Sequence, residues 1–215
     1  MHNMFHPDSK ILRYGMKFAY LMWLNILTTL CCLPIITAGA AFSAMHKIVL
    51  QIYRDEEYAV TKSYFLAFRE NFRQSTVIWV IYLFLLAGFL LDYWLILKLQ
   101  NHLLNTLLYI LPVALLLWVS TLSWAFVLQS RYRNTVLGTI RLALVVSLSH
   151  PIKTFAMVVL MTLPIWLPMM IIELLPLVAF LGFALPAILR AILYSQTFDQ
   201  LEDTDWRKAK HQAEP

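Results

Sequence analysis

Glycine is scarce in this 215-residue chain, and its scarcity excludes the common phosphate-binding loops. Only five glycines are present, and none stands in a G-x-x-x-x-G-K-[ST] or G-x-G-x-x-G arrangement. Both loops need closely spaced glycines so that backbone N–H groups can approach a phosphate. We therefore expect no nucleotide site, and a complex containing this chain would bind ATP through a partner.

Motifs of metal and hydrolytic chemistry are also missing. H-E-x-x-H and G-x-S-x-G do not occur, and the six histidines are dispersed along the chain. The two cysteines, Cys31 and Cys32, are adjacent inside an apolar segment. Neighbouring cysteines of one helix do not easily reach disulfide geometry, so we interpret them as packing residues. The sequence predicts no catalytic residue, no cofactor and no metal site, and we expect a protein that is not an enzyme.

Charged residues are few, which excludes an ordinary soluble domain. They make up 13% of the chain, whereas apolar residues make up 60%; soluble domains have about a quarter and about a half, respectively. The net charge of +5 would suggest nucleic acid in a soluble protein. Here the basic residues flank apolar segments, where they meet anionic lipid headgroups. We expect membrane lipids, and no nucleic acid, among the partners.

Six apolar stretches predict an all-α fold, a polytopic transmembrane helical bundle that forms a single membrane domain over residues 1–215. A helix needs about 20 residues to cross the hydrocarbon core. The second stretch is shorter, so it either crosses as a short helix or is re-entrant. The predicted spans are 18–38, 40–53, 77–96, 103–128, 155–174 and 177–194.

The segment between the first two spans predicts a tight hairpin turn. Pro34 interrupts the helical hydrogen bonds, while Gly39 and Ala40 allow close backbone contact. We expect larger residues at these positions to force the two helices apart.

The distribution of basic residues predicts the orientation. With the N-terminus in the cytoplasm, all of the 17 Lys and Arg residues except Lys98 lie on or near the cytoplasmic side. Loops rich in Lys and Arg resist translocation. We expect a multi-pass protein of the plasma membrane with both termini and a 199–215 tail in the cytoplasm, and Asn101 outside.

Two further segments predict amphipathic helices at the cytoplasmic interface. Residues 60–74 place aromatic residues on one face and charged residues on another, and 135–148 is too short to span. Each is expected to end at a polar break before the next span, at 74–76 and at 149–151. The first helix is the predicted partner-docking surface, formed by Phe65, Phe68, Arg69, Phe72 and Arg73.

Ionisable residues at membrane depth are candidates for function because burying a charge is costly. Asp92 and Glu173 are expected near the extracellular boundary, either hydrated, paired with Lys98, or in a substrate or proton role. Arg190 either extends to the interface or forms half of a buried polar contact.

Two other polar residues lie in the early spans. Asn25 is expected to hydrogen-bond between helices. His46, next to Lys47, is expected to contact lipid headgroups rather than to act as a ligand.

The early part of the chain resembles a known family. Asn25, the segment LPIITAGAA at 33–41, Ala44, the YRDEE exit at 53–57 and the pattern F-x-x-F-R-x-N-F-R-Q at 65–74 are similar to the YesL-like proteins. These are small bacterial membrane proteins carrying a domain of unknown function. The resemblance implies a membrane protein common in Gram-positive bacteria and often encoded beside the sugar-binding proteins and permeases of carbohydrate ABC importers. It supplies no catalytic residue.

Three functions remain open from the sequence. The preferred one is a non-catalytic accessory protein that associates with the membrane subunits of a carbohydrate ABC importer and modulates its assembly or transport. The second is a small solute transporter or channel with Asp92 on its path. The third is a lipid-directed intramembrane enzyme. The predicted extracellular loops are too short to capture a substrate, which favours the first.

Overall fold

The computed structural model describes residues 10–56, 59–99, 102–132 and 134–213, and every regular element in these residues is a helix. The predicted all-α fold is confirmed. Five helical segments are long and apolar enough to cross a membrane, so the chain is a helical membrane protein. The elements are α1 (Lys10–Cys32), η1 (Ile35–Thr37), α2 (Ala38–Tyr53), α3 (Val60–Leu99), α4 (His102–Arg131), α5 (Val136–Ser149), α6 (Pro151–Met170), η2 (Ile172–Leu174), α7 (Leu175–Leu181) and α8 (Ala184–Ala213).

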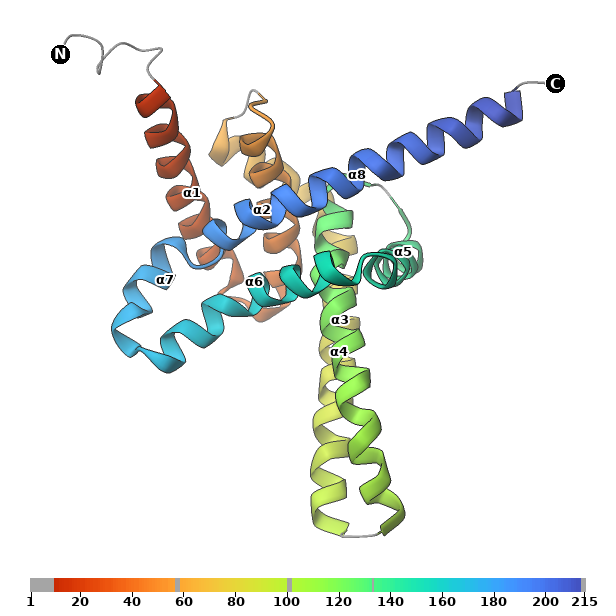
Figure 1. The fold of residues 1–215 in the computed structure, drawn as a ribbon. Coiled ribbons are helices and arrows are strands. Elements are labelled where there is room, and N and C mark those ends of the chain that lie inside the picture. The colour runs from red at the N-terminus through yellow and green to blue at the C-terminus, as the bar shows by residue number, and fades with distance from the viewer. Residues whose placement is uncertain (1–9, 57–58, 100–101, 133, 214–215) are drawn as a thin grey trace.

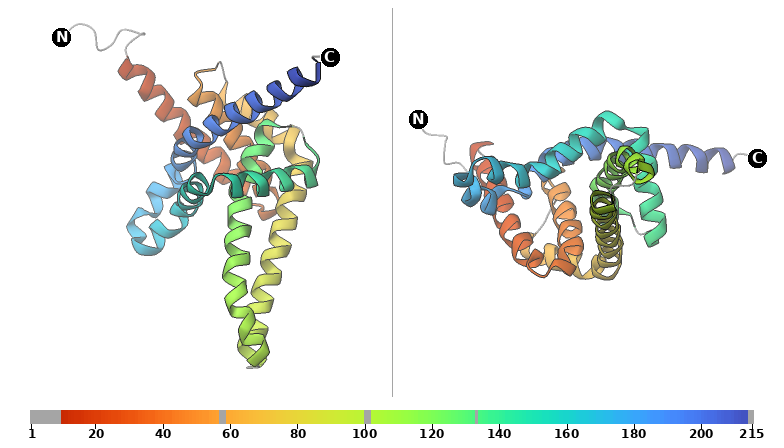
Figure 2. Two further views of the ribbon diagram at one scale, coloured as in Figure 1. Left: turned by 45° about the vertical axis from the view of Figure 1, so that its right-hand side comes forward. Right: turned by 90° about the horizontal axis from the view of Figure 1, so that it is seen from below.

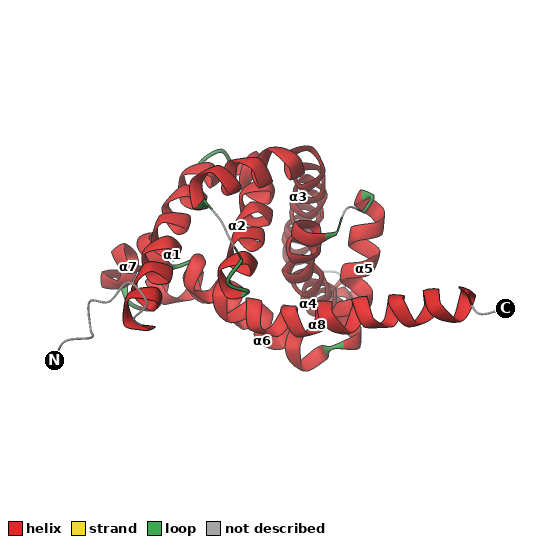
Figure 3. Cartoon of the chain, turned by 90° about the horizontal axis from the view of Figure 1, so that it is seen from above, coloured by secondary structure: helices red, strands yellow, loops and turns green. Residues whose placement is uncertain are grey.

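Two parts of the molecule differ in their surroundings. The second half of α3 and the first half of α4 form an antiparallel pair that extends away from all other helices (Figure 1; Figure 2, left). We call this pair the arm and assign to it residues 83–99 and 102–118. The remaining helices form a body in which α6 and α8 run along one side, as Figure 3 shows from above. The start of α1, the end of α2, the start of α3 and the end of α8 lie on the side of the body opposite the arm's tip (Figure 1).

α2 lies at the centre of the body, in contact with α1, α3, α4 and α8. Its first turns carry small residues, which permit close helix packing. A β-carbon on Gly39 would lie 2.6 Å from the Ser75 carbonyl oxygen and 2.6 Å from Trp79 Cβ, both on α3. The small residues predicted to form a tight turn therefore hold α2 against α3. The turn itself begins where α1 ends at Cys32, and Pro34 precedes η1.

One predicted boundary is wrong. Residues 60–74 and 77–96 were expected to be separate helices, but α3 runs without interruption through Gln74, Ser75 and Thr76. Polar side chains do not themselves interrupt a helix when its backbone hydrogen bonds stay intact. By contrast, the break expected at 149–151 is present between α5 and α6, where Pro151 occupies the first turn of α6.

The sixth predicted span is also not a single helix. Residues 177–194 are divided between α7 and α8, and α8 continues through most of the predicted 199–215 tail to Ala213. The carboxamide oxygen of Asn25 on α1 accepts hydrogen bonds from the backbone N–H groups of Phe183 (2.8 Å) and Ala184 (3.0 Å). The first turn of a helix has N–H groups without intrahelical acceptors, so Asn25 caps α8 from another helix.

The remaining predicted helices lie close to their positions. The short span 40–53 corresponds to α2, the span 103–128 to α4 and the interfacial helix 135–148 to α5. The spans 18–38 and 155–174 are both shifted earlier, to α1 and α6. Asn101, predicted to be extracellular, lies outside the described residues.

Candidate functional site

The inner face of α3 packs against the body over its first six turns. The buried residues on this face are Val60, Tyr64, Ala67, Ser75, Ile78 and Tyr82. Tyr64 is fully enclosed and stacks on Phe68, with ring centroids 6.3 Å apart. Phe68 itself is partly buried against the core, so one of the three aromatic residues predicted for docking faces inward.

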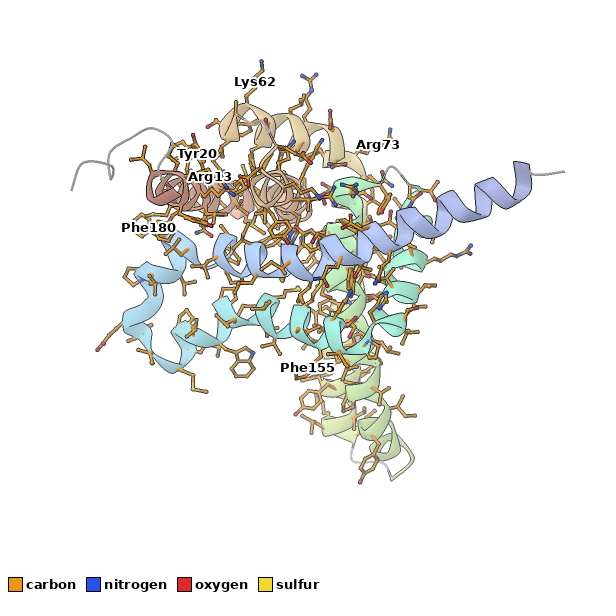
Figure 4. The ribbon with its side chains drawn as sticks, turned by 45° about the horizontal axis from the view of Figure 1, so that its top comes forward. Arg13, Tyr20, Lys62, Arg73, Phe155 and Phe180 are labelled. Atoms are coloured by element: carbon orange, nitrogen blue, oxygen red, sulfur yellow. The ribbon has the colours of Figure 1, made fainter. Side chains whose placement is uncertain are left out.

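The outer face of the same turns is exposed. Phe65 and Phe72 retain 48% and 39% of their accessible surface, and Arg69 and Arg73 are exposed beside them. Residues spaced by four, seven and eight positions share one side of a helix, so these four side chains form a single surface. Figure 4 shows Arg73, and Lys62 one turn before Phe65, pointing away from the body. We call Phe65, Arg69, Phe72 and Arg73 the α3 face.

Ion pairs fix the end of the body that carries this face. Lys47 on α2 pairs with Glu70 on α3 at 2.9 Å, and Arg54 pairs with Asp199 on α8 at 2.9 Å. Lys17 on α1 pairs with Asp55 at 2.6 Å. Asp55 has a φ of 54°, a left-handed conformation that Asp tolerates at helix ends. The hydrogen bond from Lys17, together with the positive charges of Lys17 and Arg13, lowers the pKa of the Asp55 carboxyl.

The two acidic residues predicted at membrane depth are both exposed, and neither lines any of the three cavities described below. Asp92 is exposed on the arm, and Glu173 is exposed in η2. Of the alternatives for these residues, pairing with Lys98 is not what the structure has, since the Lys98 ammonium lies 4.4 Å from the Trp94 ring centroid.

Arg190 and His46 meet inside the body. Arg190 Nη2 on α8 lies 2.7 Å from His46 Nε2 on α2, and the two residues are only 6% and 2% exposed. The expectation that His46 contacts lipid headgroups is therefore wrong, and of the two alternatives for Arg190 the structure has the buried polar contact. A guanidinium only donates hydrogen bonds, so Nε2 accepts and the imidazole is neutral with its proton on Nδ1. Tyr194 supports this arrangement, packing edge-on against the imidazole at 5.9 Å.

This pair lines one end of a cavity of about 160 Å³. The walls come from α2, α3, α4, α6 and α8 and are otherwise almost entirely apolar. They consist of Phe42, Met45, Trp79, Leu122, Phe126, Leu160, Met161, Pro164, Ile165, Phe183 and Pro186. Trp79 Nε1 donates to the Ile35 carbonyl oxygen at 2.7 Å, so its polar atom is already engaged. His46 and Arg190 are the polar groups that remain for a ligand.

Two other cavities have apolar walls with little polar character. One, of about 530 Å³, lies between α4 and the α5–α6 junction, and one of about 170 Å³ lies among α6, α7 and α8. Within the described ranges, no three His, Cys, Asp or Glu side chains gather as a metal ion would require.

Sequence reasoning did not join His46 to Arg190, although a signal was present. His46 follows a run of small residues, and such a run favours a helix packed among other helices rather than one facing lipid. A polar side chain on an enclosed helix needs a polar partner. The partner of His46 is set by the crossing of α8 over α2. His46 and Arg190 are 144 residues apart, so no local sequence pattern relates them.

The comparisons with known proteins identify one related domain. A family model described as "Protein of unknown function, DUF624" matches residues 18–93, which include most of α1, all of α2 and most of α3. No curated protein and no solved structure matches the chain. The matched part contains His46 and the α3 face, whereas Arg190 lies beyond it.

Proposed function

We propose that this chain is a non-catalytic accessory membrane protein that associates with the membrane subunits of a carbohydrate ABC importer and modulates its assembly or transport. The α3 face is the observation that carries this proposal. Two exposed phenylalanines alternate with two exposed arginines there, and aromatic residues and Arg are enriched in protein interfaces. The choice of partner rests on the resemblance to the YesL-like proteins.

The length of α3 supports a docking role outside the hydrocarbon. With 40 residues the helix is about 60 Å long, whereas the hydrocarbon core is about 30 Å thick. If the arm crosses the membrane, the first turns of α3 extend beyond it. The Lys47–Glu70 ion pair and the buried inner face of α3 hold those turns against the body, so a partner would meet a preorganised surface.

The basic residues favour a cytoplasmic location for this surface. The first turns of α3, which carry Lys62, Arg69 and Arg73, lie at the end of the body opposite the arm's tip (Figure 1), whereas Lys98 is in the last turn of α3, within the arm. We infer a multi-pass plasma membrane protein with the α3 face and both termini in the cytoplasm.

Labelling of single cysteines by an impermeant reagent tests the orientation, in a background without Cys31 and Cys32. Cysteine at position 69 should react only after the cells are opened, whereas cysteine at position 98 should react in intact cells. Reaction of position 69 from outside would reverse the orientation and remove the cytoplasmic docking surface.

Charge reversal tests the docking proposal. In Arg69→Glu/Arg73→Glu, the membrane subunits of the importer should no longer co-purify in mild detergent, because four units of charge change on the α3 face. The matched control is Lys98→Glu/Arg141→Glu, which reverses the same charge elsewhere and should retain the importer. Equal recovery of the importer with both double variants would show that the α3 face is not the docking surface.

A further inference from the structure

The buried Arg190–His46 pair has more hydrogen-bond donors than acceptors. Arg190 Nε and His46 Nδ1 are both enclosed, and neither has a hydrogen-bond partner. Since His46 Nε2 accepts from Arg190, its Nδ1 carries a proton, so both unsatisfied atoms are donors. A site with unused donors fits a ligand that only accepts hydrogen bonds.

The pair also has a positive charge without a counter-ion. The ion pairs of the described residues all lie elsewhere and involve Asp55, Glu70 and Asp199. The neutral imidazole of His46 does not balance the guanidinium charge. Burying an unbalanced charge is costly, and proteins normally avoid it by pairing the charge with an opposite one. An anion placed beside Arg190 would reduce this cost.

The walls of the cavity suit the rest of the ligand. Phe42, Phe126 and Leu160 are among the apolar side chains that surround the space leading to Arg190. Hydrocarbon groups are favourable in such surroundings, whereas an ion without an apolar part would leave most of the cavity unfilled. A cavity of about 160 Å³ is close to the size that accepts one benzene molecule, so it holds a headgroup and the first few carbons of a chain.

We propose that this cavity is a binding site for an amphiphilic anion, an alkyl chain ending in a carboxylate or a phosphate, whose headgroup binds Arg190 and His46. The chain contacts the apolar walls, and any carbons beyond the first few extend out of the cavity. A guanidinium and a second N–H donor together match the several acceptor oxygens of either headgroup. The site is independent of the α3 face, so it does not depend on the importer being the partner.

Four probes separate the components of this ligand. The full-length protein in non-ionic detergent is mixed with decanoate, decyl phosphate, 1-decanol or inorganic phosphate, and the midpoint of thermal unfolding is measured against probe concentration. A ligand that binds only the folded state raises this midpoint in a saturable way. Decanoate, decyl phosphate or both should do so, and the stronger of the two identifies the preferred headgroup. Decanol, which lacks charge, and inorganic phosphate, which lacks a chain, should have no saturable effect.

Variants assign the effect to this cavity. Arg190→Met retains the length of the side chain and removes its charge, and it should weaken binding of the better anion by about tenfold or more, as measured by calorimetry. Leu160→Trp leaves Arg190 unchanged and fills the apolar space, and it should also weaken binding. Arg141→Gln, an exposed arginine on α5, is the matched control and should bind as the wild type does.

The outcomes are distinct. Protection by decanol equal to that by the anions would mean that the cavity takes hydrocarbon without selecting charge, which overturns the proposal. Protection by inorganic phosphate alone would show a site for a free ion rather than an amphiphile. If Arg190→Met fails to fold, Leu160→Trp decides, and unchanged anion binding in that folded variant would place the ligand elsewhere.

Discussion

α2 and the arm are both apolar helical structures, but their surroundings are opposite. In the segment that contains α2, 67% of the most apolar window is buried inside the protein, whereas in α3 the corresponding share is 11%. The residues differ accordingly: α2 begins with Ala38, Gly39, Ala40 and Ala41, and the arm exposes Phe84, Leu90 and Tyr109. Helices that pack on helices use small residues, and helices that face lipid use large apolar ones.

Hydropathy does not distinguish an apolar helix that is buried in the protein from one that is exposed on its surface. Both segments are apolar enough to be predicted as membrane spans, yet one is enclosed by protein and the other contacts little of it. α4 has both environments within one helix. Its residues 120–130 are buried, whereas residues 109, 110, 112 and 113 are exposed. The size of the residues and the presence of polar ones, rather than mean hydropathy, distinguish the two environments.

Glycine substitution should produce the largest difference between them. Gly39→Leu should prevent folding or cost more than about 3 kcal/mol, because the new side chain meets the α3 backbone at Ser75. Gly88→Leu in the arm is the matched control, since nothing lies within 4 Å of its added β-carbon. Yield of monodisperse protein and thermal unfolding in detergent measure both. Normal stability of Gly39→Leu would mean that α2 and α3 are not in close contact.

Truncation of a large side chain should give the next largest difference. Ile48→Ala on α2 should cost about 2–5 kcal/mol, because Ile48 is fully buried and its removal leaves a cavity. Leu90→Ala on the arm should cost less than about 0.5 kcal/mol, since Leu90 is 61% exposed. Chemical denaturation of the two variants beside wild type makes the comparison. A large cost for Leu90→Ala would indicate that a protein partner covers the arm.

Removal of the cap on α8 should have a smaller effect. Asn25→Ala leaves two backbone N–H groups without their acceptor and should cost about 1–3 kcal/mol. Asn71→Ala is the control, because its carboxamide bonds only within its own helix, to the Ala67 carbonyl at 3.2 Å. Hydrogen exchange at the start of α8 should rise in the first variant alone. Unchanged exchange there would show that Asn25 does not hold this helix end.

The smallest effect should come from Asp55, outside the membrane segments. Its pKa is lower in the folded protein than in the unfolded chain, so the ionised form stabilises the fold above the ordinary Asp pKa, and this contribution disappears as the pH falls through the lower, folded pKa. Between about pH 5 and pH 3, Asp55→Asn should therefore lose less stability than wild type does. Identical curves for wild type and Asp55→Asn would contradict a role for the Lys17–Asp55 pair.

Much of the fold follows from local pattern, whereas the errors lie where contacts distant in sequence decide the structure. Apolar periodicity identified most of the helical regions but not the continuation of α8 to Ala213, and Pro151 was a reliable boundary because proline restricts the residue before it. The polar residues at 74–76 were not a boundary, and of the three Gln74 has a partner on another segment, because its side chain donates to the Asn134 carbonyl oxygen. Only the tertiary structure supplies that partner.

The two candidate sites also differ in how far the sequence alone predicts them. The α3 face could be found from the sequence because aromatic and basic residues recur there at helical spacing, although the pattern did not show which aromatics face inward. The Arg190–His46 cavity could not be found, because it needs five helices to meet. The break between α7 and α8 was missed for a similar reason. The backbone N–H group freed at this break donates to Asn25 on α1, a partner distant in sequence.

The Asn25 cap also has a consequence for the order in which the protein is assembled. Asn25 emerges from the ribosome early, and the N–H groups it receives belong to residues made 158 positions later. During synthesis α1 is therefore made long before α8, and the Asn25 carboxamide oxygen cannot cap α8 until α8 has been made and inserted. Contacts so distant in sequence form late because a long chain must first be brought together. The docking of α8 on α1 is thus a late step of assembly, because Asn25 caps α8 only when these two distant helices have come together.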